Sequence, residues 1–131
     1  MKKLILVMLC MIASTSALAE WKLIGGDTES IFCYIEPTSI KKEGSKATVW
    51  MLNNYVSPQT DFDDNNPYLS SKLKVKYDCK KETMKYLNIL YFKEKMGDGK
   101  MINMMNSESR EFPIPPNSIA ETLFKSVCGT N

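Results

Sequence analysis

Histidine is absent from this sequence of 131 residues. Without an imidazole group, Ser-His-Asp and Cys-His catalysis, histidine zinc sites and histidine pH switches are all excluded. Carboxylate pairs can perform acid–base chemistry alone, so one route to an enzyme stays open. We nevertheless expect a protein that is not an enzyme, with no catalytic residue, no cofactor and no metal site.

Long apolar runs are also missing, apart from a short stretch at the start of the chain. Leu4–Ile12 is too short to cross a bilayer about 30 Å thick, and no stop-transfer segment follows it. Two lysines precede this stretch, and the small-residue run Ala13–Ala19 follows it. The pattern predicts a signal peptide over residues 1–19, cleaved after Ala19, and a periplasmic or secreted mature protein.

The N-terminal segment has two alternatives to a cleaved signal peptide. The first is a buried N-terminal helix or a membrane anchor, which the short apolar stretch and the small-residue run disfavour. The second is a lipoprotein modified at Cys10. Met8 and Leu9 are too large for the positions before a lipidated cysteine, so the sequence disfavours this alternative as well.

The mature chain has no excess of charge of either sign. The full sequence has 17 basic and 15 acidic residues, and the lysines at positions 2 and 3 leave with the signal peptide. A surface for nucleic acid needs a clear basic excess, so no nucleic-acid partner is expected. Residues 20–131 suit one domain with a modest core.

Three cysteines remain after cleavage: Cys33, Cys79 and Cys128. They are too few for a four-thiolate metal site, and in an oxidising compartment two of them are expected to pair, with three pairings formally open. We favour Cys79–Cys128, because the first ends a predicted strand and the second ends a predicted helix. Cys33 lies in the apolar run Ile31–Ile35, where it serves as a small buried side chain.

Most of the mature chain has the pattern of strands. Strands are expected at residues 21–24, 31–36, 46–55, 72–79, 83–95 and 100–106, with a tight turn at 37–40 and a long loop at 57–68. The segment 72–79 is the clearest, because lysines and apolar residues alternate in it with a period of two.

The C-terminal segment has the pattern of a helix. Pro113, Pro115 and Pro116 exclude regular strand or helix before it, and Ser118 with Glu121 matches a capping box. The apolar residues of this helix share one face, which must lie on the sheet. The sequence therefore predicts an α+β fold: an antiparallel sheet of about six strands with one C-terminal helix packed on it and tied by the disulfide.

Two groups of charged residues are candidate sites. Lys72, Lys74 and Lys76 line one side of a predicted strand and form a candidate partner surface for a polyanion, such as a glycan sulfate or a lipid phosphate. The alternative is a solvated face that discourages edge-to-edge association. Acidic residues at 61–64 offer oxygen ligands, but they lack the glycine and the distant glutamate of an EF-hand type loop, so we expect a solvated connection.

The predicted strands 46–55 and 83–95 are apolar on both faces, although one helix can cover only one face. We expect the uncovered face to form a homodimer or a partner surface. The alternative is that the loop at 57–68 folds back across this face, which would leave a monomer.

Short segments spread over the mature region are similar, in their residues and in their order, to those of a known protein family. They are Trp21, Tyr34–Pro37, Ser39–Ile40, Val49–Trp50, Pro58–Gln59, Tyr68–Lys72, Tyr77–Lys80, Met96–Gly97, Gly99–Lys100, Pro116–Ser118 and Val127–Gly129. In this order and spacing they resemble the surface-adhesin protein E family of small exported bacterial proteins. The resemblance implies a six-stranded sheet with a disulfide-tied helix, dimerisation, and binding of host proteins such as vitronectin, laminin and plasminogen.

The resemblance assigns no binding residue in this sequence, because the segments through which the family binds its partners do not align with it. The chain also departs from the family by lacking a lipobox cysteine and by having the additional Cys33. We therefore expect an exported, non-catalytic binding module that recognises a host matrix or envelope protein. The alternative is a periplasmic structural or envelope-associated protein with no host ligand.

Overall fold

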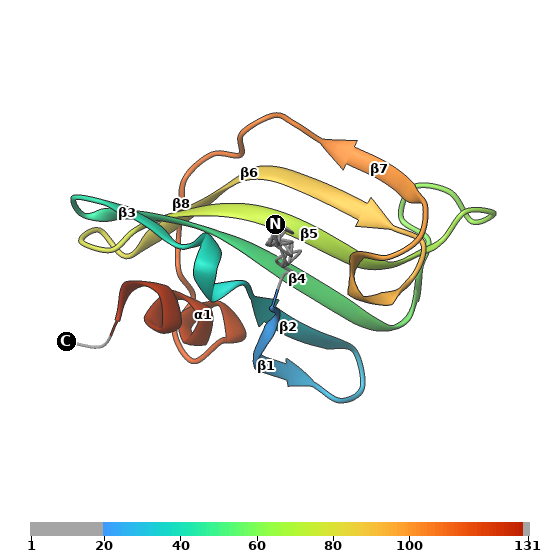
Figure 1. Cartoon of the computed structure of the whole chain (residues 1–131), viewed down its shortest axis with the longest axis horizontal. Helices are drawn as coiled ribbons and strands as arrows, with labels where there is room; N and C mark the ends of the chain where they lie inside the picture. The colour runs from blue at the N-terminus through green and yellow to red at the C-terminus, as the bar shows by residue number, and fades with distance from the viewer. Residues whose placement is uncertain (1–19, 130–131) are drawn as a thin grey trace, which may run out of the picture.

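The computed structural model describes residues 20–129, so the predicted signal peptide lies outside the described residues. Figure 1 shows a twisted sheet with one helix, α1, lying against it. The strands are β1 (Lys22–Asp27), β2 (Ile31–Ile35), β3 (Lys41–Glu43), β4 (Lys46–Gln59), β5 (Tyr68–Asp78), β6 (Thr83–Phe92), β7 (Met101–Met105) and β8 (Phe112–Pro113). The helix α1 spans Ile119–Cys128, and two short 3-10 helices are η1 (Pro37–Ser39) and η2 (Lys95–Gly97).

All eight strands belong to one antiparallel sheet. Its main order is β1-β2-β4-β5-β6-β7, while β3 pairs with the beginning of β4 and β8 pairs with the beginning of β6. The predicted fold class is confirmed. The expected strand number of about six was too low, because β3 and β8 were not predicted.

Each missed strand has a local reason. The three residues of β3 are charged and exposed, so they show no alternation, and a turn at Gly44 with φ of 60° folds them back onto β4. In β8, Pro113 pairs with Thr83 at the edge of the sheet. The prediction that Pro113 excludes a strand was wrong, because an edge strand tolerates a residue that has no backbone N–H.

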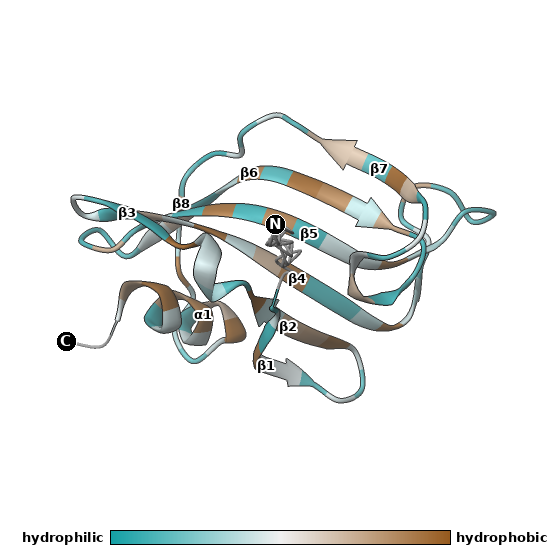
Figure 2. Cartoon of the chain, viewed as in Figure 1, coloured by the Kyte–Doolittle hydropathy of each residue, from teal (hydrophilic) through white to brown (hydrophobic). Residues whose placement is uncertain are grey.

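Strands β4 and β5 form the long centre of the sheet, and both exceed their predicted lengths. β4 continues to Gln59 and β5 begins at Tyr68, so the connecting loop shrinks to residues 60–67. Figure 2 shows the alternation of hydrophobic and hydrophilic residues along β5. Its apolar side chains form part of the core, while its lysines lie on the other face.

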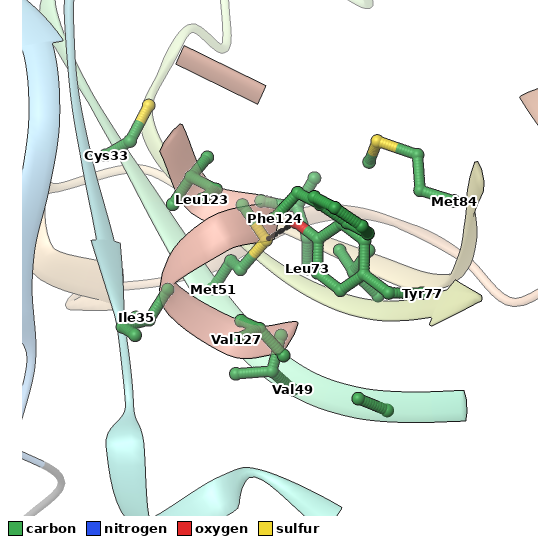
Figure 3. Packing of buried hydrophobic residues seen from close by; sticks show 12 residues of the cluster. Cys33, Ile35, Val49, Met51, Leu73, Tyr77, Met84, Leu123, Phe124 and Val127 are labelled. Atoms are coloured by element: carbon green, nitrogen blue, oxygen red, sulfur yellow. Dashed lines mark hydrogen bonds between the residues drawn. The ribbon is translucent and has the colours of Figure 1, made fainter. Parts of the chain in front are cut away.

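The core lies between α1 and one face of the sheet (Figure 3). From α1, the buried residues Leu123, Phe124 and Val127 point at the sheet, where Val49 and Tyr77 are completely buried. The remaining members of this cluster are Cys33, Ile35, Ala47, Met51, Leu73, Val75 and Met84. Each large apolar side chain buried in this way stabilises the fold by roughly 1.5–3 kcal/mol.

Hydrogen bonds cap both ends of α1, and Ser118 and Glu121 cap the first turn, where the sequence predicts the start of the helix. The hydroxyl of Ser118 accepts a hydrogen bond from the N–H of Glu121 at 3.2 Å. The Glu121 carboxylate in turn accepts from the N–H of Asn117 at 3.2 Å. At the other end, the N–H of Gly129 donates to the carbonyl of Lys125 at 2.9 Å, with φ of 84° at the glycine.

The disulfide Cys79–Cys128 is confirmed, with the two Cα atoms 5.6 Å apart and a sequence separation of 49. It joins the end of β5 to the last residue of α1. Cys33 is a free cysteine and is buried in the core. The bond therefore fixes the C-terminal end of the helix on the sheet.

Candidate functional site

The face of the sheet opposite α1 carries the lysines that the sequence singled out. Lys72, Lys74 and Lys76 alternate on β5 with the core residues, and antiparallel pairing sets them opposite Leu52, Trp50 and Thr48 of β4. On the other side they pair with Leu90, Asn88 and Lys85 of β6. The face therefore combines positive charge with a tryptophan and a threonine hydroxyl.

Lys74 and Lys76 line a hollow of about 200 Å³, which we call the lysine hollow. Lys41 of β3 and Lys46 of β4 approach the same hollow from the neighbouring strands. The other residues around it are Thr48, Leu87, Glu43 and Glu108. Sequence reasoning missed Lys41 because β3, the strand that carries it, was not predicted. It missed Lys46, although its strand was predicted, because the register of β4 against β5 was not known.

The lysines that line the hollow are not used in ion pairs within the described residues 20–129. Lys85, which pairs with Lys76 across β5 and β6, donates to the Glu108 carboxylate at 3.0 Å. This hydrogen bond lowers the pKa of Glu108, so the carboxylate stays ionised. By contrast, none of the four lysines of the hollow forms an ion pair within residues 20–129. The hollow therefore holds an excess of positive charge that the described chain leaves unneutralised.

Lys72 behaves differently from its two neighbours on β5. Its ammonium lies over the ring of Phe92, 5.2 Å from the centroid, in a cation–π contact. A side chain at Gly97 would put its Cβ 2.3 Å from Cε of Lys72, so the lysine stem packs directly on the backbone of η2. The structure thus separates the three predicted lysines: two line the hollow, and the third is held by neighbouring groups.

A hairpin containing η2 covers the other end of this face. The Asn54 amide accepts from the N–H of Met96 at 2.7 Å, and the Ser70 hydroxyl accepts from the N–H of Gly97 at 2.9 Å. Ser70 also donates to the carbonyl of Glu94 at 2.5 Å. These bonds satisfy two polar side chains that are buried in the sheet. The face that the helix leaves uncovered is therefore partly covered by the chain itself.

The loop at residues 60–67 packs through one aromatic side chain. Phe62 contacts Tyr91 and Tyr68, with ring centroids 4.7 and 5.6 Å away, yet it remains 43% exposed. The Asp61 carboxylate accepts from the hydroxyl of Tyr68 at 2.5 Å, and Asp63 accepts from the N–H of Asn65 at 2.9 Å. The acidic residues thus make hydrogen bonds within their own loop and with the first residue of β5.

Between residues 20 and 129, no group of three or more acidic, histidine or cysteine side chains is placed to hold a metal ion. In the same part of the chain, no helix has the length and apolar character needed to cross a membrane.

A second hollow, of about 230 Å³, lies between α1 and the sheet and is lined mainly by apolar side chains, including Cys33. Burial raises the pKa of the Cys33 thiol to about 11. At neutral pH the thiol is therefore protonated and a poor nucleophile.

The outer edge of the sheet is apolar. β7 contains no charged residue, and Met101, Met104 and Met105 are all 45–47% exposed. β7 ends the main strand order, so one side of its backbone is unpaired. The opposite edge, β1, differs because it contains Lys22 and Asp27. An edge without charges is a template for pairing with another chain.

Comparison with known proteins gives a consistent result. A family profile described as Surface-adhesin protein E matches residues 21–129. The fold is similar to a structure of Haemophilus influenzae protein E in crystal form II, with a TM-score of 0.68 and 11% identity over 87% of this chain and 91% of that one. A second structure of the same protein gives a TM-score of 0.65 at 11% identity, covering 87% of each chain. No curated protein gave a match to the sequence.

Proposed function

The chain belongs to the surface-adhesin protein E family, and we propose that it is an exported, non-catalytic module that binds a protein or matrix partner. The observation that carries this proposal is the extent of the family match, which covers residues 21–129 and therefore nearly the whole described domain. A disulfide-tied sheet that carries a lysine-rich hollow on the face opposite the helix supports a role in recognition.

Binding is tested with the purified mature domain. Immobilised residues 20–131 are exposed to isolated host matrix proteins and, in parallel, to envelope extract, and bound proteins are identified by mass spectrometry. Saturable binding of a matrix protein is the expected result. Capture of envelope components alone would favour the alternative of a periplasmic structural protein with no host ligand.

Export is part of the same proposal, with cleavage after Ala19. The intact mass of the protein recovered from the periplasm or medium decides this point. A retained N-terminus, or a lipid adduct on Cys10, would contradict it. Cell fractionation then separates the two functions, because an adhesin must reach the outside of the cell.

We also infer that the domain forms a homodimer through the β7 edge. Support comes from the three exposed methionines of β7 and from the absence of charge along it. Pairing two such strands would satisfy the unpaired backbone groups and bury apolar surface. A closed two-fold dimer is the simplest assembly of this kind.

A further inference from the structure

We propose that the lysine hollow binds the sulfate groups of a linear sulfated polysaccharide that lies along β5. This inference rests on the proposed function, for which it names a ligand class: the acidic glycan component of an extracellular matrix. Four lysines from three different strands, Lys41, Lys46, Lys74 and Lys76, converge on this hollow.

The first argument is the local concentration of charge. The mature chain is balanced overall, with 15 basic and 15 acidic residues once Lys2 and Lys3 are removed. Among the residues that line the hollow, however, the four lysines outnumber the two carboxylates of Glu43 and Glu108, and Glu108 is already paired with Lys85. A concave surface of one charge sign raises the local concentration of ligands of the opposite sign.

The second argument is the spacing of the ammonium groups. Residues i and i+2 of a strand are about 6.6 Å apart, so Lys74 and Lys76 present charges at intervals along β5. Lys41 and Lys46 add charges across the neighbouring strands. The ammonium group of lysine is a flexible point charge. Unlike the planar guanidinium of arginine, it cannot bind one phosphate through two parallel hydrogen bonds. This array suits a chain with repeated anionic groups better than a single small anion.

The third argument concerns the polar and aromatic groups beside the charges. Thr48 lies in the hollow and can donate its hydroxyl to a sulfate oxygen or a sugar hydroxyl. Trp50 pairs with Lys74 on the same face beside the hollow and is half-buried, and an indole ring can pack against the C–H face of a sugar ring. Both features suit a carbohydrate.

An anionic bilayer is the competing partner, and the distribution of apolar residues disfavours it. A face that binds a membrane surface combines basic residues with apolar side chains that insert between the lipids. Here the most exposed large apolar side chains lie outside the hollow, although Met104, two strands away from β5, has a register position on the same face. They are Leu23, Val56, Phe62, Met101, Met104 and Met105, and none of them lines the hollow.

The experiment measures binding of a fluorescent heparin octasaccharide to the mature domain by anisotropy. Two double variants remove hollow lysines from different strands: Lys74→Gln with Lys76→Gln, and Lys41→Gln with Lys46→Gln. The control, Lys22→Gln with Lys100→Gln, removes the same charge at two exposed positions outside the hollow. Thermal unfolding of each variant checks the fold, and two independent hollow variants keep the test valid if one misfolds.

We expect each hollow variant to bind about tenfold more weakly or worse, since each removes two ammonium groups that would face the anionic chain. The control should bind like the wild type, an unsulfated octasaccharide should not bind, and added salt should weaken binding. Equal losses in all three variants, or no binding to the wild type, would overturn the proposal. So would binding to phosphatidylglycerol vesicles without binding to heparin.

The outcome also separates this inference from the proposed function. If the wild-type domain binds a matrix protein whose glycans have been removed, but does not bind the octasaccharide, the glycan site is wrong and the adhesin-like function stands. If it binds the octasaccharide but no matrix protein, the site stands and the protein-binding function does not.

Discussion

The ring of Tyr77 on β5 meets the ring of Phe124 on α1 edge-on, with centroids 5.7 Å apart and an angle of 66° between the planes. Tyr77 is completely buried, and its hydroxyl donates to Sδ of Met51 at 3.5 Å. Together these two contacts join α1 to the central strands β4 and β5, and Figure 3 shows the three residues from close by.

Replacing this aromatic side chain of the helix should therefore destabilise the whole domain. We expect Phe124→Ala to lower the free energy of unfolding by about 3–5 kcal/mol, through lost burial and the cavity left behind. Urea unfolding followed by fluorescence measures the change. Ser126→Ala, at an exposed position of the same helix, is the control and should change stability by less than about 0.5 kcal/mol. A loss below about 1 kcal/mol for Phe124→Ala would show that α1 is not held by this core.

The disulfide adds a covalent constraint to the same contact. With a sequence separation of 49 between the partners, replacing Cys79 and Cys128 by alanine should cost about 4 kcal/mol in the chain-entropy model. Guanidinium unfolding of the oxidised wild type and of the double variant measures the difference. Cys33→Ala is the control, because it leaves the bond in place. Non-reducing peptide mapping that linked Cys33 to either partner would contradict the assignment.

Cys33 should make stability depend on pH in the alkaline range. Burial raises the pKa of its thiol from 9.0 to about 11. The unfolded thiol therefore releases its proton at lower pH than the folded thiol, and the free energy of unfolding should fall as pH rises from about 9 to about 11. Tyr77, whose pKa burial also raises, adds a loss of the same sign.

Urea unfolding across this pH range measures the effect, and Cys33→Ala isolates the contribution of the thiol. The variant should lose less stability with rising pH than the wild type does. Identical pH profiles for the two proteins would show that the Cys33 thiol titrates similarly in the folded and unfolded states.

The two edges of the sheet should differ in self-association. We expect the mature domain to sediment as a dimer at micromolar concentration, and Met104→Lys to weaken the dimer by placing a charge on the β7 edge. Leu23→Lys makes the same change on the opposite edge strand, β1, where the exposed fraction is 53%, and should leave the dimer intact. If the wild type is a monomer, the β7 edge does not pair with a second copy. The loop at residues 60–67 and the η2 hairpin would then cover enough apolar surface within one domain.

The local features of this fold could be predicted from the sequence. The alternation on β5 assigned its lysines and its core residues to opposite faces, and the Ser118–Glu121 pattern set the start of α1. These features depend on backbone periodicity and on hydrogen bonds between residues a few positions apart. For the same reason, the long strands were found while their ends were displaced by several residues.

Only the tertiary structure decided what the lysines of β5 meet. Lys41 lies more than thirty residues before Lys74, on a charged strand with no alternation, and it reaches the hollow because β3 folds back onto β4. Lys72, identical to its neighbours by sequence, is instead held over Phe92 by the η2 hairpin. Such contacts depend on strand register and on turns between distant segments, and the composition of each segment does not contain that information.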